Sequence, residues 1–316
     1  MDCLWLVIPC YNEQEVLGET SRQLREIMRD LIQKQKISES SRIAFVNDGS
    51  KDRTWPIIQQ LCAEDALFCG VNLAHNRGHQ NALLAGLMTA KEHADMAISL
   101  DADLQDDVGV IEQFVDAYHE GNDIVYGVRS SRKTDTFFKR FTAEGFYKLM
   151  RWLGVDIVFN HADYRLMSRR ALEGLAQYGE VNLFLRGIVP QIGYQTTIVT
   201  YERHERFAGE SKYPLKKMIS FALDGITSFS VKPLRLSLVL GGFALLVSVC
   251  MLIYGLCRHF MGFTVSGWTS LSVSIWALGG IQLFMLGVVG EYIGKLYLES
   301  KHRPRYIIES VLLREK

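Results

Sequence analysis

Two long stretches without an acidic or basic side chain most constrain how this chain of 316 residues can fold. The first covers residues 236–257, and the second lies between Arg258 and Glu291. A helix of about 20 apolar residues spans the ~30 Å hydrocarbon core of a bilayer, and core helices of soluble proteins are seldom this long without a charge. We therefore expect two transmembrane helices, over the first stretch and over about residues 269–290, joined by a short loop.

The flanking charges predict how these helices are oriented. Positive charges precede the first span at Lys212, Lys216, Lys217, Lys232 and Arg235, and follow the second at Lys295, Lys301, Arg303 and Arg305. The intervening loop carries only Arg258. Because Lys and Arg concentrate in cytoplasmic loops, we expect both termini in the cytosol and a multi-pass protein of the cell inner (plasma) membrane.

Ahead of the spans, residues 211–233 predict a juxtamembrane amphipathic helix. Between Pro214 and Phe229, apolar residues recur at helical spacing. Such a helix suits the membrane interface or, alternatively, packs on the preceding domain. The expected parts of the chain are a cytosolic domain over 1–210, this interfacial helix, a transmembrane hairpin over 234–294 and a cytosolic tail over 295–316.

The cytosolic domain alternates apolar runs with helical patterns, which predicts an α/β fold. Buried strands are expected over residues 4–9, 43–47, 69–73, 96–100 and 124–128, and helices over 13–35, 53–64, 80–93 and 108–120. This alternation favours a mostly parallel, Rossmann-like sheet that binds ligands at the carboxyl ends of its strands. No G-x-G-x-x-G follows the first strand, so a dinucleotide-binding dehydrogenase lacks its main signature.

Charge balance and cysteine spacing exclude two further classes. Lys plus Arg and Asp plus Glu are equal at 35 each, so no basic bias indicates nucleic-acid binding. The six cysteines are scattered, without a C-x-x-C pair or zinc-site spacing. They are expected to be reduced apolar residues, which fits a cytosolic domain.

A cluster of four carboxylates follows the strand expected at 96–100. It contains Asp101, Asp103, Asp106 and Asp107. Such a cluster repels itself unless a cation neutralises it, and its oxygens suit Mg²⁺ or Mn²⁺, with nucleotide phosphates completing the shell. The alternative is that these acids cap a helix. We adopt that interpretation for Asp106 and Asp107, which precede the helix expected from residue 108.

Several motifs resemble those of family-2 glycosyltransferases with the GT-A fold. They are the D-A-D-L-Q run from Asp101, V-I-P-C-Y-N-E at 7–13, V-N-D-G-S at 46–50 and N-R-G at 76–78. A second set consists of A-D-Y-R-L-M-S-R at 162–169, N-L-F at 182–184, G-E-S-K-Y at 209–213 and the two spans. This set is similar to bactoprenol glucosyltransferases and, more distantly, to dolichol-phosphate mannose synthases. The D-P-x-S-G-F run of the mannose synthases is absent, which favours the bactoprenol branch.

The resemblance implies a metal-dependent, inverting enzyme. It would move a hexose or hexosamine from a nucleotide-sugar, with UDP favoured over GDP, to undecaprenyl (polyprenyl) phosphate for cell-surface glycan modification. It also implies a homo-oligomer. One alternative is a processive polysaccharide synthase, which would need more spans and a Q-x-x-R-W motif that we do not find. Another is a non-catalytic membrane scaffold of the same fold, which the intact D-x-D-x-Q run argues against.

The same resemblance assigns roles to individual residues. Those for the nucleotide-sugar are Pro9, Tyr11, Glu13, Asp48, Asp101 and Lys212, and those for Mg²⁺ or Mn²⁺ are Asp103 and Gln105. Arg129 and Arg140 match the residues that bind the acceptor phosphate. Arg132, Lys133 and Lys139 lie close to Arg140 in the sequence and are alternatives to it. Asp163 matches a catalytic base; the alternative is that it serves as a structural partner of Arg165 or of a nearby arginine. Arg206 and Lys212 match a mobile loop over the donor diphosphate.

Overall fold

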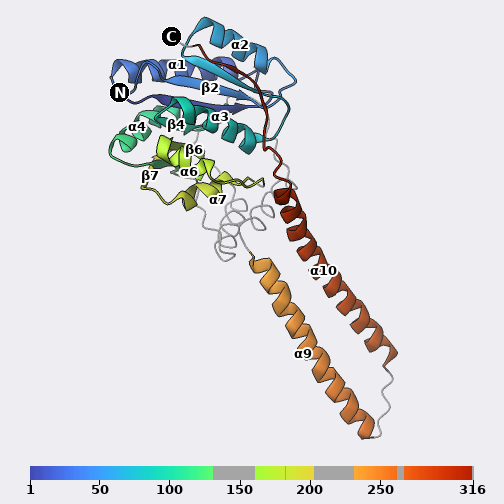
Figure 1. The fold of residues 1–316 in the computed structure, drawn as a ribbon. Coiled ribbons are helices and arrows are strands. Elements are labelled where there is room, and N and C mark those ends of the chain that lie inside the picture. The colour runs from blue at the N-terminus through green and yellow to red at the C-terminus, as the bar shows by residue number, and fades with distance from the viewer. Residues whose placement is uncertain (131–160, 182, 203–230, 262–266, 315–316) are drawn as a thin grey trace. The chain divides into compact units, whose positions relative to one another are not determined.

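The computed structural model describes residues 1–130, 161–181, 183–202, 231–261 and 267–314 (Figure 1). The described residues up to 202, together with 303–314, form one compact unit. Those of 231–302 form the other. The first unit contains the expected α/β domain and the second the two long helices.

The first unit is built on one sheet with strand order β7-β5-β6-β4-β1-β2-β3-β8 among the described residues. Its strands are β1 (Leu4–Cys10), β2 (Arg42–Asn47), β3 (Phe68–Leu73), β4 (Met96–Ser99), β5 (Ile124–Arg129), β6 (His161–Ser168), β7 (Thr196–Tyr201) and β8 (Ile308–Leu312). β6 runs antiparallel between β4 and β5, and β8 runs antiparallel to β3, while the other pairs are parallel. The five predicted strands are confirmed as β1 to β5, and the sheet is mostly parallel, as expected.

Helices connect these strands, and those before β5 lie near their four predicted positions, whereas the helices after β6 were not predicted. They are α1 (Leu17–Gln33), α2 (Thr54–Glu64), α3 (His79–His93), η1 (Val108–Val110), α4 (Ile111–His119), α6 (Arg169–Ala176), α7 (Leu185–Ile188) and η2 (Val189–Ile192). The first helix starts later than predicted, because the amides of Val16 and Leu17 both bond to the carbonyl of Glu13 in a turn. The helix predicted over 108–120 is divided into the 3₁₀ turn η1 and α4.

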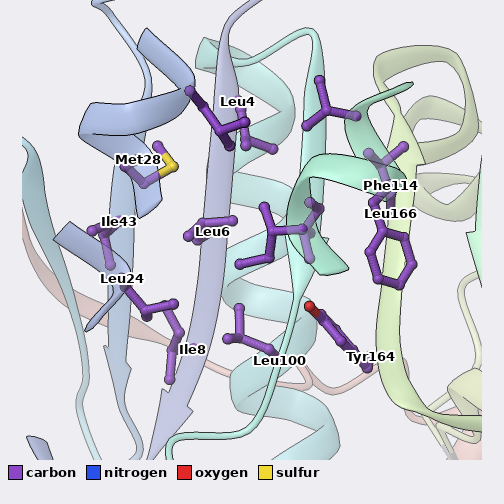
Figure 2. Packing of buried hydrophobic residues seen from close by; sticks show 14 of the residues in the cluster. Leu4, Leu6, Ile8, Leu24, Met28, Ile43, Leu100, Phe114, Tyr164 and Leu166 are labelled. Carbon is purple, nitrogen blue, oxygen red and sulfur yellow. The ribbon is translucent and has the colours of Figure 1, made fainter. Parts of the chain in front are cut away.

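Both faces of β1 are covered, which explains why all seven of its residues are buried. On one face, Leu4, Leu6 and Ile8 belong to the same apolar cluster as Leu24 and Met28 of α1 (Figure 2). Burying one such side chain contributes about 1.5–3 kcal/mol. This face therefore fixes α1 against the centre of the sheet.

The opposite face of β1 lies against α3. The ring of Trp5 stacks on His93, with centroids 5.3 Å apart. A Cβ at Gly86 would lie 2.4 Å from Val7 and 2.6 Å from Val46, so only glycine lets the helix approach this closely. This contact fixes the start of α3 at the carboxyl ends of β2 and β3.

The C-terminal residues depart from the predicted organisation. We expected residues 295–316 to form a separate tail, but α10 (Trp268–Ser300) contains the first of them and 308–312 form β8. Residues from Arg303 on belong with the α/β unit. β8 pairs with β3, whose backbone donors and acceptors would otherwise be unpaired on that edge. The chain thus adds a strand to the sheet after the long helices.

The second unit consists of α9 (Lys232–Phe260) and α10. Large apolar side chains are exposed on both, including Leu238 at 78% and Leu283 at 72%. Within the described residues, Ala277–Ser300 is the segment long and apolar enough to cross a membrane, with hydropathy 1.4. It lies nearer the C-terminus than the span predicted at about 269–290. The span predicted over 236–257 forms part of α9, and its crossing of a membrane stays a prediction.

Candidate active site

Hydrogen bonds join the loops that follow β1 and β2 at the carboxyl end of the sheet. The amide of Asn12 donates to Ser50 Oγ at 3.0 Å, and the amide of Glu13 donates to Thr54 Oγ1 at 2.9 Å. In return, the amide of Lys51 donates to Asn12 Oδ1 at 2.9 Å. Asn12 holds a left-handed backbone with φ 53°, a conformation that asparagine tolerates better than most residues. The two loops therefore form one wall.

Asp48 joins a third loop to this wall. Its carboxylate accepts hydrogen bonds from the amides of Arg77 at 2.7 Å and Gly78 at 2.9 Å. Burial raises the pKa of Asp48, and these two bonds oppose that rise. Gly49 has φ +64°, and a Cβ there would lie 2.5 Å from the amide nitrogen of Asn76. The N-D-G-S and N-R-G motifs are thus packed against each other.

The residues assigned to the nucleoside lie around these loops. Pro9 is buried in β1, Tyr11 is 37% exposed just after it, and Glu13 is half-buried. Asp48 is 1% exposed and both its oxygens accept backbone hydrogen bonds. In the structure Asp48 therefore holds the loops together, and its direct contact with a nucleotide stays a prediction. Lys212 lies outside the described residues.

The acidic loop follows β4 and holds the D-A-D-L-Q run. Leu104 has a left-handed φ of 55°, and Asp103 Oδ1 accepts from the amide of Gln105 at 3.2 Å. Such a conformation is strained for leucine and clusters at functional sites. Asp107 accepts from the amide of Gly109 at 2.8 Å and so caps the following 3₁₀ turn, as expected.

The capping interpretation of Asp106 is wrong. Its side chain is buried, and its Oδ1 accepts a 2.5 Å hydrogen bond from the hydroxyl of Tyr201. Arg129 Nη2 lies 3.4 Å from the same oxygen, and Arg129 Nε lies 3.3 Å from the Tyr201 hydroxyl. Arg129 and Tyr201 are register partners on the parallel strands β5 and β7. Asp106 therefore helps to fix Arg129, the residue matched to the acceptor phosphate.

The donor set fits a divalent cation only in part. Among the described residues, no group of three or more His, Cys, Asp or Glu side chains could hold a metal ion. Mg²⁺ commonly takes one or two carboxylates, with phosphates and water completing its octahedron. Asp103 and Gln105 carry oxygens of the kind that such a partial site uses, and their role as metal ligands stays a prediction.

Asp163 lies at the centre of a cationic cluster. Its Oδ1 is 2.6 Å from Arg165 Nη2, and its two oxygens lie 3.3 and 3.2 Å from Nε and Nη2 of Arg186. His79 Nε2 lies 3.6 Å from Asp163 Oδ2 and 3.6 Å from Asp101 Oδ1. The Asp163 side chain is 12% exposed. The partnership of Asp163 and Arg165, one of the two predicted alternatives, is therefore confirmed, while a base role for Asp163 is a separate question.

The register of the sheet explains how these side chains meet. Ser99 at the end of β4 pairs with Arg165 on the antiparallel β6. Asp101 is two residues after Ser99 and Asp163 is two residues before Arg165. Because the strands are antiparallel, both residues lie at the same end of this strand pair. His79 is the first residue of α3 and Arg186 belongs to the short α7. Sequence reasoning missed both, because neither carries a local signal of a distant carboxylate.

The cluster changes the acidity of its members. Burial opposes the charged form of His79, but the hydrogen bond to Asp163 and the charge of Asp101 outweigh it and raise its pKa to about 9. Burial likewise opposes ionisation of Asp163, yet Arg186, His79 and Arg165 hold its pKa well below its usual range. Partial burial, opposed by His79 and reinforced by Asp106, raises the pKa of Asp101 to about 6. Asp163 is thus a fixed negative charge at neutral pH.

Two of the predicted arginines, Arg140 and Arg206, lie outside the described residues. The described site therefore brings together, from the predicted set, the nucleoside loops, the acidic loop, Arg129 and Asp163. It adds His79, Arg186, Asp106 and Tyr201. Interlocked loops beside an acidic loop and fixed cationic side chains are an arrangement suited to binding a phosphorylated ligand.

Comparison with known proteins identifies the family. Residues 5–175 match the model described as glycosyl transferase family 2, and 232–296 match the model described as GtrB C-terminal hairpin. The second match coincides with α9 and most of α10. It therefore supports interpreting these helices as one structural element.

Full-length relatives agree with this match. The glycosyltransferase YkoT of Bacillus subtilis is 55% identical over 99% of this chain and 93% of that protein. The bactoprenol glucosyl transferase of Shigella phage SfV is 43% identical over 96% of this chain and 97% of its own. A prophage bactoprenol glucosyl transferase homolog of Escherichia coli is 42% identical, with coverage of 97% and 98%. The expected resemblance and the GT-A-like fold are confirmed, and the chain belongs to glycosyl transferase family 2, the enzymes of glycosyl transfer.

Proposed function

We propose that this protein transfers one hexose, with glucose the first candidate, from a UDP-sugar to a polyprenyl phosphate at a membrane. One observation carries the proposal. The acidic loop lies at the same end of the strands as two arginines that buried carboxylates hold, Arg129 by Asp106 and Arg186 by Asp163. Relatives named bactoprenol glucosyl transferases, 42–43% identical over nearly the whole chain, support the substrate class. The lipid product would serve cell-surface glycan modification.

The donor nucleotide would lie against the loops after β1, β2 and β3. In this proposal Tyr11 and Glu13 contact the nucleoside, with Pro9 and Asp48 shaping the pocket around it. Asp101 would contact the ribose. The oxygens of Asp103 and Gln105 would hold Mg²⁺ or Mn²⁺, which supplies positive charge to the diphosphate when bound. In this proposal the leaving group would lie beside the cationic cluster.

The acceptor would be held by Arg129 together with Arg140. A phosphate monoester has a second pKa near ~6, so at cytosolic pH it is largely dianionic and already nucleophilic. Its main requirement is to be held in line with the anomeric carbon. The buried Asp106 and the Tyr201 hydroxyl contribute by limiting the orientations that Arg129 adopts.

Asp163 is better suited to fixing cations than to taking a proton. A general base works best with a pKa near the working pH, and the pKa of Asp163 lies well below its usual range. Its carboxylate instead orients Arg186 through two hydrogen bonds. We therefore propose that Asp163 positions Arg186 and His79, while Arg206 and Lys212 close over the leaving diphosphate.

Direct attack by the lipid phosphate inverts the anomeric configuration. An α-linked nucleotide sugar would give a β-linked lipid phosphate. We further propose that α9 and α10 both cross the plasma membrane, that both termini are cytosolic, and that the protein is a homo-oligomer. The apolar exposed faces of the two helices support the membrane part of this proposal.

A donor panel tests the proposal. Purified full-length protein in detergent is incubated with undecaprenyl phosphate and Mg²⁺ plus UDP-glucose, UDP-galactose, UDP-N-acetylglucosamine or GDP-mannose, and the lipid is followed by mass spectrometry. We expect one sugar per lipid from a UDP donor. A ladder of sugars would indicate the processive alternative, and no lipid product from any donor would contradict the proposal.

A further inference from the structure

A row of hydrogen bonds crosses the carboxyl end of the sheet from the C-terminal strand to the loop after β2. Glu309 Oε2 accepts from Asn72 Nδ2 at 2.6 Å. Asn72 Oδ1 accepts from Asn47 Nδ2 at 2.7 Å. Asn47 Oδ1 then accepts from the backbone amide of Ser50 at 3.2 Å. These bonds join strands β8, β3 and β2 in one relay.

The relay ends in the wall assigned to the donor nucleoside. Ser50 accepts the amide of Asn12 on its hydroxyl. Asp48, two residues before Ser50, accepts the amides of Arg77 and Gly78. The position of Ser50 therefore affects all of the loops after β1, β2 and β3.

A β-bulge directs Glu309 toward the relay. Asn72 pairs with Ser310 and Leu73 pairs with Ile308, so Glu309 is the extra residue between two register positions. Bulges bend a strand locally and re-aim a side chain. On the other side, Asn47 and Asn72 are register partners on β2 and β3 and are 3% and 8% exposed. The relay is thus buried at its two asparagines, half-buried at Ser50 and exposed at Glu309.

The carboxylate of Glu309 sets the direction of the whole relay. A carboxylate only accepts hydrogen bonds, so the amide nitrogen of Asn72 must face it. The oxygen of Asn72 then faces the amide nitrogen of Asn47. That in turn leaves the oxygen of Asn47 for the Ser50 amide. If the first amide turned round, two NH₂ groups would face each other in a buried site, which is costly.

We propose that Glu309 is a positioning residue for the donor nucleotide, acting through Asn72, Asn47 and Ser50. The strand that follows the helix hairpin thereby completes the donor site from the far edge of the sheet. This inference rests on the proposed function for its nucleotide, whereas the relay itself can be tested without any ligand.

The test uses two substitutions of opposite hydrogen-bonding character in the full-length protein in detergent. In Glu309→Lys a donor replaces the acceptor, whereas in Glu309→Gln an acceptor oxygen remains. Hydrogen–deuterium exchange of residues 47–54 is measured without ligand, and binding is measured by UDP titration with Mg²⁺. We expect Glu309→Lys to speed exchange at Ser50 and to weaken UDP binding about tenfold, the loss of roughly one charge-assisted hydrogen bond. Glu309→Gln should stay within about twofold of the wild type.

Val311→Lys is the control, because it introduces a lysine into β8 at an exposed position outside the relay. It should leave exchange and UDP binding unchanged. Glu309→Met, which removes the acceptor without adding a donor, should change both in the same direction as Glu309→Lys. Wild-type exchange and UDP affinity in Glu309→Lys would overturn the inference, as would equal losses in Lys and Gln variants. If the wild type binds neither UDP nor GDP, the proposed function fails, and the exchange data alone decide on the relay.

Discussion

Asp163 Oδ1 lies 2.6 Å from Nη2 of Arg165, whose side chain is 1% exposed. Both residues come from β6, two positions apart, so their side chains leave the strand on the same face. The same guanidinium also donates from Nη1 to the carbonyl of Leu185 at 3.4 Å. Asp163 therefore compensates a positive charge that water hardly reaches.

Replacing Asp163 by Asn should destabilise the α/β domain. Removing one partner of a buried ion pair costs about 3–5 kcal/mol, because the remaining charge is left unpaired. Asp123→Asn is the matched control: Asp123 is also buried, but its partner Arg170 is 62% exposed and solvent can hydrate it. Urea unfolding should show a much larger loss for the Asp163 variant. Equal losses would mean that Arg165 finds other compensation.

The kinetics of the same variant distinguish positioning from base catalysis. Loss of a general base typically costs ~10²–10⁴-fold in rate. We expect Asp163→Asn chiefly to raise the KM for the lipid. Its kcat, measured with saturating lipid, should fall by less than ~10²-fold, since the lipid phosphate needs no base. The acidic limb of the pH–rate profile should remain, because the lipid phosphate titrates near ~6. A larger fall in kcat with that limb lost would restore Asp163 as the base.

His79 should make a pH-dependent contribution to stability. Its pKa is about 9 in the folded protein and about 6.5 in an unfolded chain. A raised pKa stabilises the folded state fully below the unfolded value, and this contribution is lost as pH rises through about 9. The difference in urea midpoint between wild type and His79→Gln should therefore shrink between pH 7 and 10. A constant difference would show that packing alone, not charge, accounts for it.

Turnover should require a divalent metal ion that Asp103 binds. We expect Asp103→Ala to abolish turnover and chelator to do so reversibly in the wild type. Asp107→Ala is the matched control on the same loop, because that carboxylate caps the turn at Gly109. Its activity should stay close to that of the wild type. Full wild-type activity in excess chelator would remove the metal from the proposed mechanism.

The proposed topology predicts opposite locations for two reporters. A fusion after Lys316 should report the cytosol, and one inserted between residues 262 and 267 should report the external side, because Lys and Arg flank the helices rather than the loop. Alkaline phosphatase and green fluorescent protein fusions measure this directly. Both reporters on one side would mean that α10, the helix between them, does not cross, and a cytosolic loop with an external C-terminus would mean that α9 does not cross.

The sequence predicted the central strands because they are buried on both faces and therefore appear as continuous apolar runs. It did not predict β6, whose Asp163 and Arg165 look like a polar segment until their pairing is seen. β8 was missed because its partner, β3, lies more than 230 residues earlier. The local hydrophobic pattern predicts a strand that is buried on both faces. It does not predict a strand that forms only by pairing with a strand distant in the sequence.

The site divides in the same way. Motifs identified the nucleoside loops and the acidic loop, because each follows directly after a predicted strand. The role of Asp106 was mistaken, since its partner Tyr201 is 95 residues away, on β7, where it pairs with Arg129 of β5. His79 and Arg186 reach Asp163 through the antiparallel insertion of β6, a feature that spacing does not encode.

The identity of the released nucleotide distinguishes transfer of a sugar from transfer of a sugar phosphate. Transfer of a sugar alone leaves the diphosphate on the nucleotide, whereas transfer of a sugar phosphate would leave a nucleoside monophosphate. With UDP-glucose and undecaprenyl phosphate, we expect UDP in equal amount to a lipid monophosphate that carries one β-linked glucose. Release of UMP with a lipid diphosphate, or UDP release with no sugar on the lipid, would contradict it.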